Sequence, residues 1–180
     1  MGLRKMVVPL VLLTALLLLP AQPWSRSDAR ASTPALLPFS STANPYSIGY
    51  PAGWRHLVGH LGGAFSLFTF DQFVDPTRPH GFPVNVVVAR LPLAAPASDA
   101  GLRALYEASL RRRTPVSELG PVLVAGRTIT LVGYVDVAQH VQAYLAEGRL
   151  SWIFSLTTAR GDRNRWQPLF VRMLESFQPR

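Results

Sequence analysis

The sequence predicts an α+β domain in which helices flank an antiparallel β-sheet. Three observations support this fold class. Short segments of alternating or β-branched apolar residues recur between Gly- and Pro-rich turns, as expected of strands. Two longer segments repeat apolar residues at helical spacing. The order is strands, helix, strands, helix, and the repeated strand–helix–strand unit of parallel sheets is missing from the pattern.

Strand patterns dominate the first half of the chain. Four strands are predicted here, over residues 46–50, 54–58, 64–70 and 84–91. Pro51 and Gly53 form a tight turn between the first two strands. Residues 71–83 contain three prolines and a glycine, and we therefore expect a loop.

The first helix is predicted to follow Ser98, whose hydroxyl can cap the first turn. Its apolar stripe consists of Leu102, Leu105, Tyr106 and Leu110. Thr114 and Pro115 are expected to end it, because a residue that precedes proline avoids helical geometry.

Strand patterns return in residues 122–124 and 127–132. Residues 134–145 and 150–157 flank Glu147-Gly148, which predicts a hairpin. A second amphipathic helix is predicted from the spacing of Trp166, Leu169, Phe170, Met173, Leu174 and Phe177. Pro168 is expected at the start of that helix or within an irregular first turn.

Residues 1–31 are predicted to be a signal peptide or a signal anchor. Two positive charges at residues 4 and 5 precede the uncharged, largely apolar run Met6–Leu19, which Pro20 ends. This run is shorter than the ~20 residues of a typical spanning helix. Residues 32–44 are rich in Pro, Ser and Ala and predict a linker before a domain over residues 45–180.

Export across the cytoplasmic membrane follows from this signal. The protein is expected to be secreted, periplasmic or at the cell surface, or retained by an uncleaved anchor. Ala21 and Ala29–Ala31 are alternative cleavage points. The chain has no cysteine, so a lipoprotein anchor, disulfides and thiolate metal sites are excluded.

The charge balance is basic, with 18 Lys and Arg against 10 Asp and Glu. Residues 1–31 hold four basic residues and one acidic residue, which leaves a net charge of +5 on the rest. This balance favours acidic partners or anionic surfaces. An export signal disfavours nucleic acid as the partner.

Several short motifs resemble the PsbP-like superfamily, which includes an extrinsic subunit of photosystem II and many exported bacterial proteins of unknown function. The segment Tyr46–Trp54 (YSIGYPAGW) resembles its opening motif, and Leu174–Phe177 (LESF) resembles its closing helix. Ala146–Trp152 with Ser155–Thr158 resembles its last hairpin. The similarity covers about residues 45–178. It implies an α/β/α sandwich and an accessory or binding role, and no functional residue is carried over.

The residues of these motifs are predicted to be structural. They are Tyr46, Tyr50, Pro51, Gly53, Trp54, Trp152, Trp166, Ser176 and Phe177. The large aromatic rings are suited to the core. No cofactor is predicted.

Three histidines are candidates for a metal site. His56 and His60 would share one face of a helix, whereas in a strand they would stand about 13 Å apart unless Gly59 bends the chain. His80 follows Asp71 and Asp75, which we interpret as turn residues. Surface or half-buried histidines are the alternative.

Two groups of arginines are candidates for contact with an anionic surface. They are Arg111, Arg112 and Arg113 at the first helix, and Arg160, Arg163 and Arg165 near the second. This contact requires that the two groups share one face, and solvated helix ends are the alternative.

The sequence thus favours an exported, non-enzymatic accessory or binding protein with an unknown extracytoplasmic protein partner. The loop 71–83 and the arginine-bearing helix ends are its candidate contact surfaces. A metal- or small-ligand-binding protein is the alternative, and metal content separates the two. A hydrolase is a third hypothesis, although the G-x-S-x-G, H-E-x-x-H and S-x-x-K motifs are missing.

Overall fold

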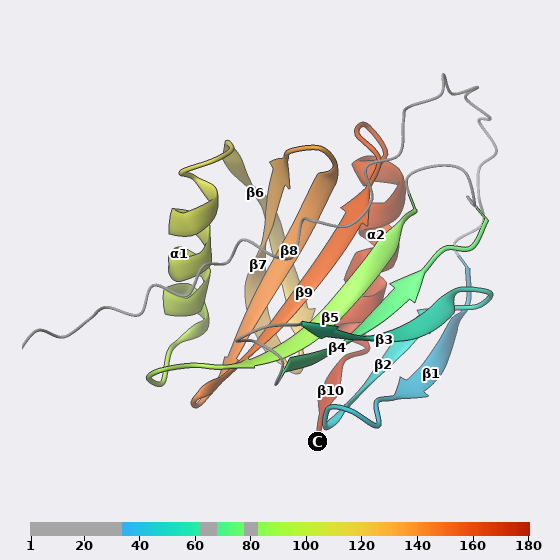
Figure 1. The fold of residues 1–180 in the computed structure, drawn as a ribbon, viewed down its shortest axis with the longest axis horizontal. Helices are drawn as coiled ribbons and strands as arrows, with labels where there is room; N and C mark the ends of the chain where they lie inside the picture. Colours follow the sequence, from blue (N-terminus) through green and yellow to red (C-terminus); the bar gives the residue numbers. More distant parts are fainter. Residues whose placement is uncertain (1–33, 62–67, 78–82) are drawn as a thin grey trace, which may run out of the picture.

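The computed structural model describes residues 34–61, 68–77 and 83–180. Within them, all strand pairings are antiparallel and two helices pack against the sheets (Figure 1). The predicted α+β class is confirmed. No helix in these ranges is both long enough and apolar enough to cross a membrane.

The strands form two sheets. A three-stranded sheet has the order β1-β2-β10, and a seven-stranded sheet has the order β3-β4-β5-β9-β8-β7-β6. The strands are β1 (Leu36–Ser40), β2 (Tyr46–Pro51), β3 (Arg55–Leu61), β4 (Phe68–Val74), β5 (Asn85–Pro92), β6 (Val116–Val124), β7 (Arg127–Val135), β8 (Gln139–Glu147), β9 (Leu150–Thr158) and β10 (Gln178–Pro179). The helices are α1 (Asp99–Leu110) and α2 (Arg163–Glu175).

The seven-stranded sheet separates two apolar cores. On one face α1 covers Tyr144 and Ile153, and on the other α2 and the small sheet cover Leu145 and Phe154. Alternate residues of a strand point to opposite faces, so β8 and β9 supply both cores. The layers agree with the sandwich that the family resemblance implies.

Both helices begin near their expected positions. Ser98 caps α1, since its Oγ accepts the Gly101 N–H at 3.1 Å. Leu105, predicted on the apolar stripe, is instead exposed, because Leu102 and Tyr106 form the buried face. Helix α2 begins at Arg163, so Pro168 lies inside it rather than at its start.

The predicted linker contains a strand. Residues 36–40 form β1 and pair with β2 from Leu36 opposite Pro51 to Ser40 opposite Ser47. Pro38 is tolerated there because β1 is an edge strand of its sheet, where one side of the strand has no neighbour that needs its N–H as a hydrogen-bond donor.

The predicted loop 71–83 begins later than expected. Asp71 lies within β4, where it stands opposite Val58 on one side and Val88 on the other. Burial of Asp71 and Phe73 explains why the strand continues to Val74. Most of the strand predicted over residues 64–70, and residues 78–82 of the loop, lie outside the described residues.

Candidate functional site

A buried carboxylate lies where the two sheets meet. The side chain of Asp71 is 1% exposed and accepts hydrogen bonds from the hydroxyls of Tyr46 at 2.6 Å and Ser41 at 2.7 Å, both on Oδ2. His56 Nε2 contacts the other oxygen, Oδ1, at 2.7 Å. We call these four residues the Asp71 cluster, and the 27% exposure of His56 is its opening to solvent.

The Asp71 cluster contains Ser, His and Asp, but not in the order that a hydrolytic triad needs. In a triad the histidine lies between the hydroxyl and the acid. Here Ser41 bonds the acid directly, and its Oγ also accepts the N–H groups of Ala43 and Asn44 at 3.2 and 3.0 Å. Burial, followed by the bond to Asp71, raises the pKa of Tyr46, so its hydroxyl stays protonated. The cluster therefore fastens the β1–β2 turn to the large sheet.

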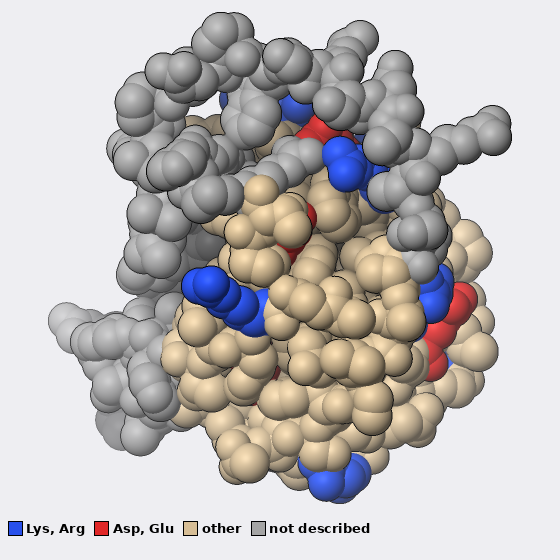
Figure 2. Space-filling model, turned by 90° about the vertical axis from the view of Figure 1, so that its right-hand side faces the viewer, with Lys and Arg blue, Asp and Glu red and all other residues tan. Residues whose placement is uncertain are grey.

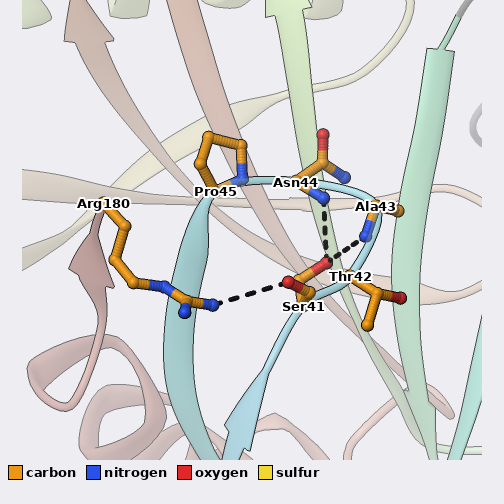
Figure 3. Close-up of a pocket in the computed structure, with 6 residues that line it drawn as sticks. All are labelled: Ser41, Thr42, Ala43, Asn44, Pro45 and Arg180. Atoms are coloured by element: carbon orange, nitrogen blue, oxygen red, sulfur yellow. Dashed lines mark hydrogen bonds between the residues drawn. The ribbon is translucent and has the colours of Figure 1, made fainter.

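A shallow hollow of about 380 Å³ lies beside this cluster. Its lining comes from the β1–β2 turn and Arg180 (Figure 3). The Arg180 guanidinium donates to the carbonyl oxygens of Ser41 and Tyr46, at 3.4 and 2.7 Å. The guanidinium and the two carbonyl oxygens are thus already hydrogen-bonded to one another. Few polar groups in the hollow remain for a small ligand.

Two of the three histidines proposed for a metal site lie in one strand of the described structure. His56 and His60 both lie in β3, opposite Phe73 and Thr69, and four strand residues span about 13 Å. His80 lies outside the described residues. No group of three or more potential ligands among His, Cys, Asp and Glu occurs in the described part of the chain.

A second histidine–aspartate pair was not foreseen from the sequence. His140 Nε2 donates to Asp136 Oδ1 at 2.9 Å, and its Nδ1 lies 3.2 Å from the Thr157 hydroxyl. This order of acid, imidazole and hydroxyl is that of a triad. However, His140 is buried and stacks on Tyr134 at 4.6 Å, and the hollow beside Ser41 does not border Thr157.

Burial also determines the charges of this pair. Desolvation lowers the pKa of His140, although the hydrogen bond and charge of Asp136 oppose the shift. Desolvation raises the pKa of Asp136, but the Ala138 N–H and His140 outweigh it, and the net pKa is lowered. A neutral imidazole and an ionised carboxylate therefore hold the β7–β8 turn in place.

On the side of the molecule that carries β1 and β3, few charged side chains appear among the described residues (Figure 2). Leu57 and Val58 of β3 are 50% and 45% exposed, and Leu37 of β1 is 42% exposed. We call these three residues the apolar edge. The rings of Phe39 and His56, 4.4 Å apart, show that the two strands adjoin. A second shallow hollow, of about 480 Å³, lies along β1 and β2.

The two groups of arginines meet at one end of the large sheet. Thr114, just after Arg111–Arg113, donates its hydroxyl to the Val135 carbonyl at 2.6 Å. Arg160 donates to the Asp136 carbonyl. The α1–β6 connection, the β7–β8 turn and the β9–α2 connection therefore lie side by side, at the upper end in Figure 1. We call this region the arginine end.

Two solved structures resemble this arrangement of strands and helices. Cyanobacterial PsbP (CyanoP) from Synechocystis sp. PCC 6803 matches with a TM-score of 0.52 and 16% identity, over 86% of this chain and 98% of its own. A Pseudomonas aeruginosa protein of unknown function matches with the same TM-score and identity, over 81% and 97%. The chain has a PsbP-like fold. No protein-family model and no curated protein matches the sequence.

In this PsbP-like fold the aromatic motif residues, far apart in the sequence, form two groups. Tyr46, Trp152 and Phe177 pack within 5.1 to 5.4 Å of one another, between ring centroids. Trp54 packs on Trp166 at 5.8 Å. The opening strand, the last hairpin and the closing helix therefore share one core.

The remaining motif residues lie around this core. Tyr50 stacks on Phe73 at 5.3 Å, and Pro51 is buried at the end of β2. Gly53 has a φ of 84°, which favours glycine. Ser176 Oγ accepts the Gly49 N–H at 2.7 Å and so ties the end of α2 to β2.

Proposed function

We propose that this PsbP-like protein is an exported, non-enzymatic accessory module that binds an extracytoplasmic protein partner through its apolar edge. The observation that carries the proposal is the half exposure of both Leu57 and Val58. Successive residues of a strand point to opposite faces. Edge strand β3 therefore exposes an apolar side chain on each of its faces, which a partner added at this edge would cover.

The two edges of the large sheet differ in a way that supports this assignment. The far edge, β6, is interrupted by Pro121 and by a bulge between Glu118 and Gly120, both of which discourage pairing. Strand β3 contains no proline and no irregularity in its register with β4. A partner strand that adds to β3 would gain main-chain hydrogen bonds and contacts with Leu57 and Val58.

The polar clusters support a binding role over a catalytic one. The Asp71 cluster and the His140 pair both use their polar atoms within the protein. Export is inferred from residues 1–31 alone. The alternative function, metal binding, would rest on His56 and Asp71, whose contact reaches the surface through His56.

Site-specific cross-linking in the native host tests this proposal. A photo-reactive amino acid replaces Val58 in the full chain, and the matched control replaces Leu123, which is 53% exposed on the other edge strand. We expect one reproducible protein adduct from position 58 and none from position 123. Mass spectrometry of the adduct also gives the mature N-terminus.

The affinity between this protein and the purified cross-linked partner then tests whether the apolar edge is the binding surface. Leu57→Asp should weaken the complex at least tenfold, because a charge replaces an apolar contact, whereas Leu123→Asp should not. Equal adducts from both positions, or equal affinity of both variants, would overturn the proposal. Stoichiometric metal in the purified protein, lost in His56→Ala, would support the alternative.

A further inference from the structure

We propose that the arginine end docks on the headgroups of an anionic lipid membrane, with the β7–β8 turn entering the interface. This goes beyond the proposed function, which assigns a protein partner to a different side of the molecule. The inference rests on an exposed apolar tip, on the cations that flank it, and on the contrast with the opposite end of the sheet.

The β7–β8 turn presents two apolar side chains to solvent. Val137 is 66% exposed and Val135 is 42% exposed. Asp136, between them, turns inward, since its Oδ1 accepts the Ala138 N–H and the His140 Nε2–H, both at 2.9 Å. The carboxylate is thus held against the protein while the valines point away from it.

Arginines flank this tip on both sides. Arg112 and Arg113 are exposed on the α1 side, where Arg112 bonds the last turn of α1. Arg160 and Arg165 are exposed on the α2 side, and Arg165 lies over the Trp166 ring. The nearest acid on α1, Glu107, is buried and bonded to Arg111, so it offsets little of this charge.

The opposite end of the sheet is arranged differently. There, Asp99 pairs with Arg127, and Glu147 accepts the Trp152 indole N–H at 2.9 Å. Arg149 donates to the Ala94 carbonyl at 2.7 Å. Cations and anions alternate at that end, whereas cations predominate at the arginine end. The two ends therefore differ in their balance of charge.

An anionic membrane suits these features better than an acidic protein does. Peripheral proteins combine a small apolar insertion with basic residues that meet anionic headgroups. A stable protein interface buries about 800 Å² per partner around a large apolar or aromatic centre. Two valines flanked by long cationic side chains match the arrangement of a peripheral membrane protein.

A fluorescent label at the tip tests the inference in the full chain. Because the chain has no cysteine, Val137→Cys can be labelled selectively with a polarity-sensitive dye. The matched control is Leu123→Cys, on β6 opposite Thr128, at the end of the sheet away from the β7–β8 turn. We expect a blue shift at position 137 on phosphatidylcholine vesicles that contain phosphatidylglycerol. No shift is expected on phosphatidylcholine alone, or at position 123 on either vesicle.

The arginines are tested in the labelled protein. Arg112→Ala with Arg113→Ala should weaken the vesicle titration roughly 25-fold, because each arginine near an anionic surface contributes about fivefold. Arg149→Ala, at the opposite end, should change it little, and high salt should abolish the shift. The dye reports the tip itself, so an apolar N-terminus that anchors the chain does not produce the signal.

Three outcomes would overturn the inference: no shift on anionic vesicles, an equal shift at position 123, or a titration unaffected by the two arginine substitutions. A shift produced by soluble polyglutamate but not by vesicles would instead assign an acidic protein to this end. Circular dichroism of each variant shows that it is folded. Loss of the Val58 adduct would leave these results unchanged, so the two proposals fail separately.

Discussion

Tyr46 donates a 2.6 Å hydrogen bond to the Asp71 carboxylate, and this contact joins the small sheet to the large one. Tyr46 lies in β2 and Asp71 in β4, and both side chains are almost fully buried. A buried carboxylate is stable only when its oxygens are hydrogen-bonded. The position of the small sheet thus depends on a few polar atoms as well as on its apolar contacts.

Removal of that hydroxyl should destabilise the protein. Tyr46→Phe keeps the ring that packs on Trp152 and Phe177, but it leaves Asp71 Oδ2 with Ser41 as its remaining donor. We expect a loss of about 1–3 kcal/mol in the free energy of unfolding, measured by urea denaturation. Tyr50→Phe is the control, since it leaves the donors of Asp71 in place. Equal losses for both variants would contradict the assigned role.

Gly49 lies where β1, β2 and the end of α2 meet, and a side chain there would be tightly packed. A Cβ added to Gly49 would lie 3.1 Å from Ser176 Oγ and 3.1 Å from Leu36 Cβ. Gly49→Ala should therefore destabilise the fold by about 1–3 kcal/mol. Gly101→Ala is the control, because a Cβ there approaches only the Ser98 hydroxyl, at 3.2 Å, and alanine favours a helix. Thermal denaturation of both variants measures the difference.

His140 should make the protein less stable in mild acid. Burial lowers its pKa below the usual 6.5, so the unfolded chain binds this proton at a higher pH than the folded protein does. Stability is therefore full above about pH 6.5 and falls as the pH drops towards the lowered pKa. Asp136, whose pKa is below 3.8, adds a further loss at lower pH.

Urea midpoints at successive pH values measure this dependence. In His140→Gln, which cannot bind the proton, the loss of stability between about pH 7 and pH 5 should be smaller than in the wild type. The label at Val137 should report the same change, because Asp136 holds the turn through His140. Parallel curves for the two proteins would contradict the role of His140.

Local patterns predicted the elements whose partners are close in sequence. The β8–β9 hairpin follows from alternation around Glu147-Gly148, and α1 follows from its cap and its stripe. Strand β1 was missed because Pro38 interrupts its apolar run, and only its pairing with β2 makes it a strand. The sequence predicts a turn residue at Asp71, because its partners Ser41, Tyr46 and His56 are 30, 25 and 15 positions away and give no local signal.

The candidate surfaces, too, depend on contacts between residues that are distant in the sequence. Both arginine groups are recognisable in the sequence as local clusters at predicted helix ends. Their proximity depends on the strand order β9-β8-β7-β6, which places the end of α1 and the end of β9 beside the β7–β8 turn. The sequence does not indicate the apolar edge, because apolar residues such as Leu57 and Val58 are equally typical of a buried strand. Their exposure follows from the edge position of β3, which is a property of the assembled sheet.

Replacement of Pro168 should stabilise the protein. It lies inside α2, where proline has no N–H to donate and its ring crowds the preceding turn. The residue is exposed, so Pro168→Ala changes few packing contacts. We expect a gain of about 1–3 kcal/mol, since alanine is favoured over proline by about 3 kcal/mol in a helix interior. Gln167→Ala is the control, with little change expected in the urea midpoint. A loss of stability in Pro168→Ala would contradict this expectation and show that proline at position 168 contributes to the packing of α2.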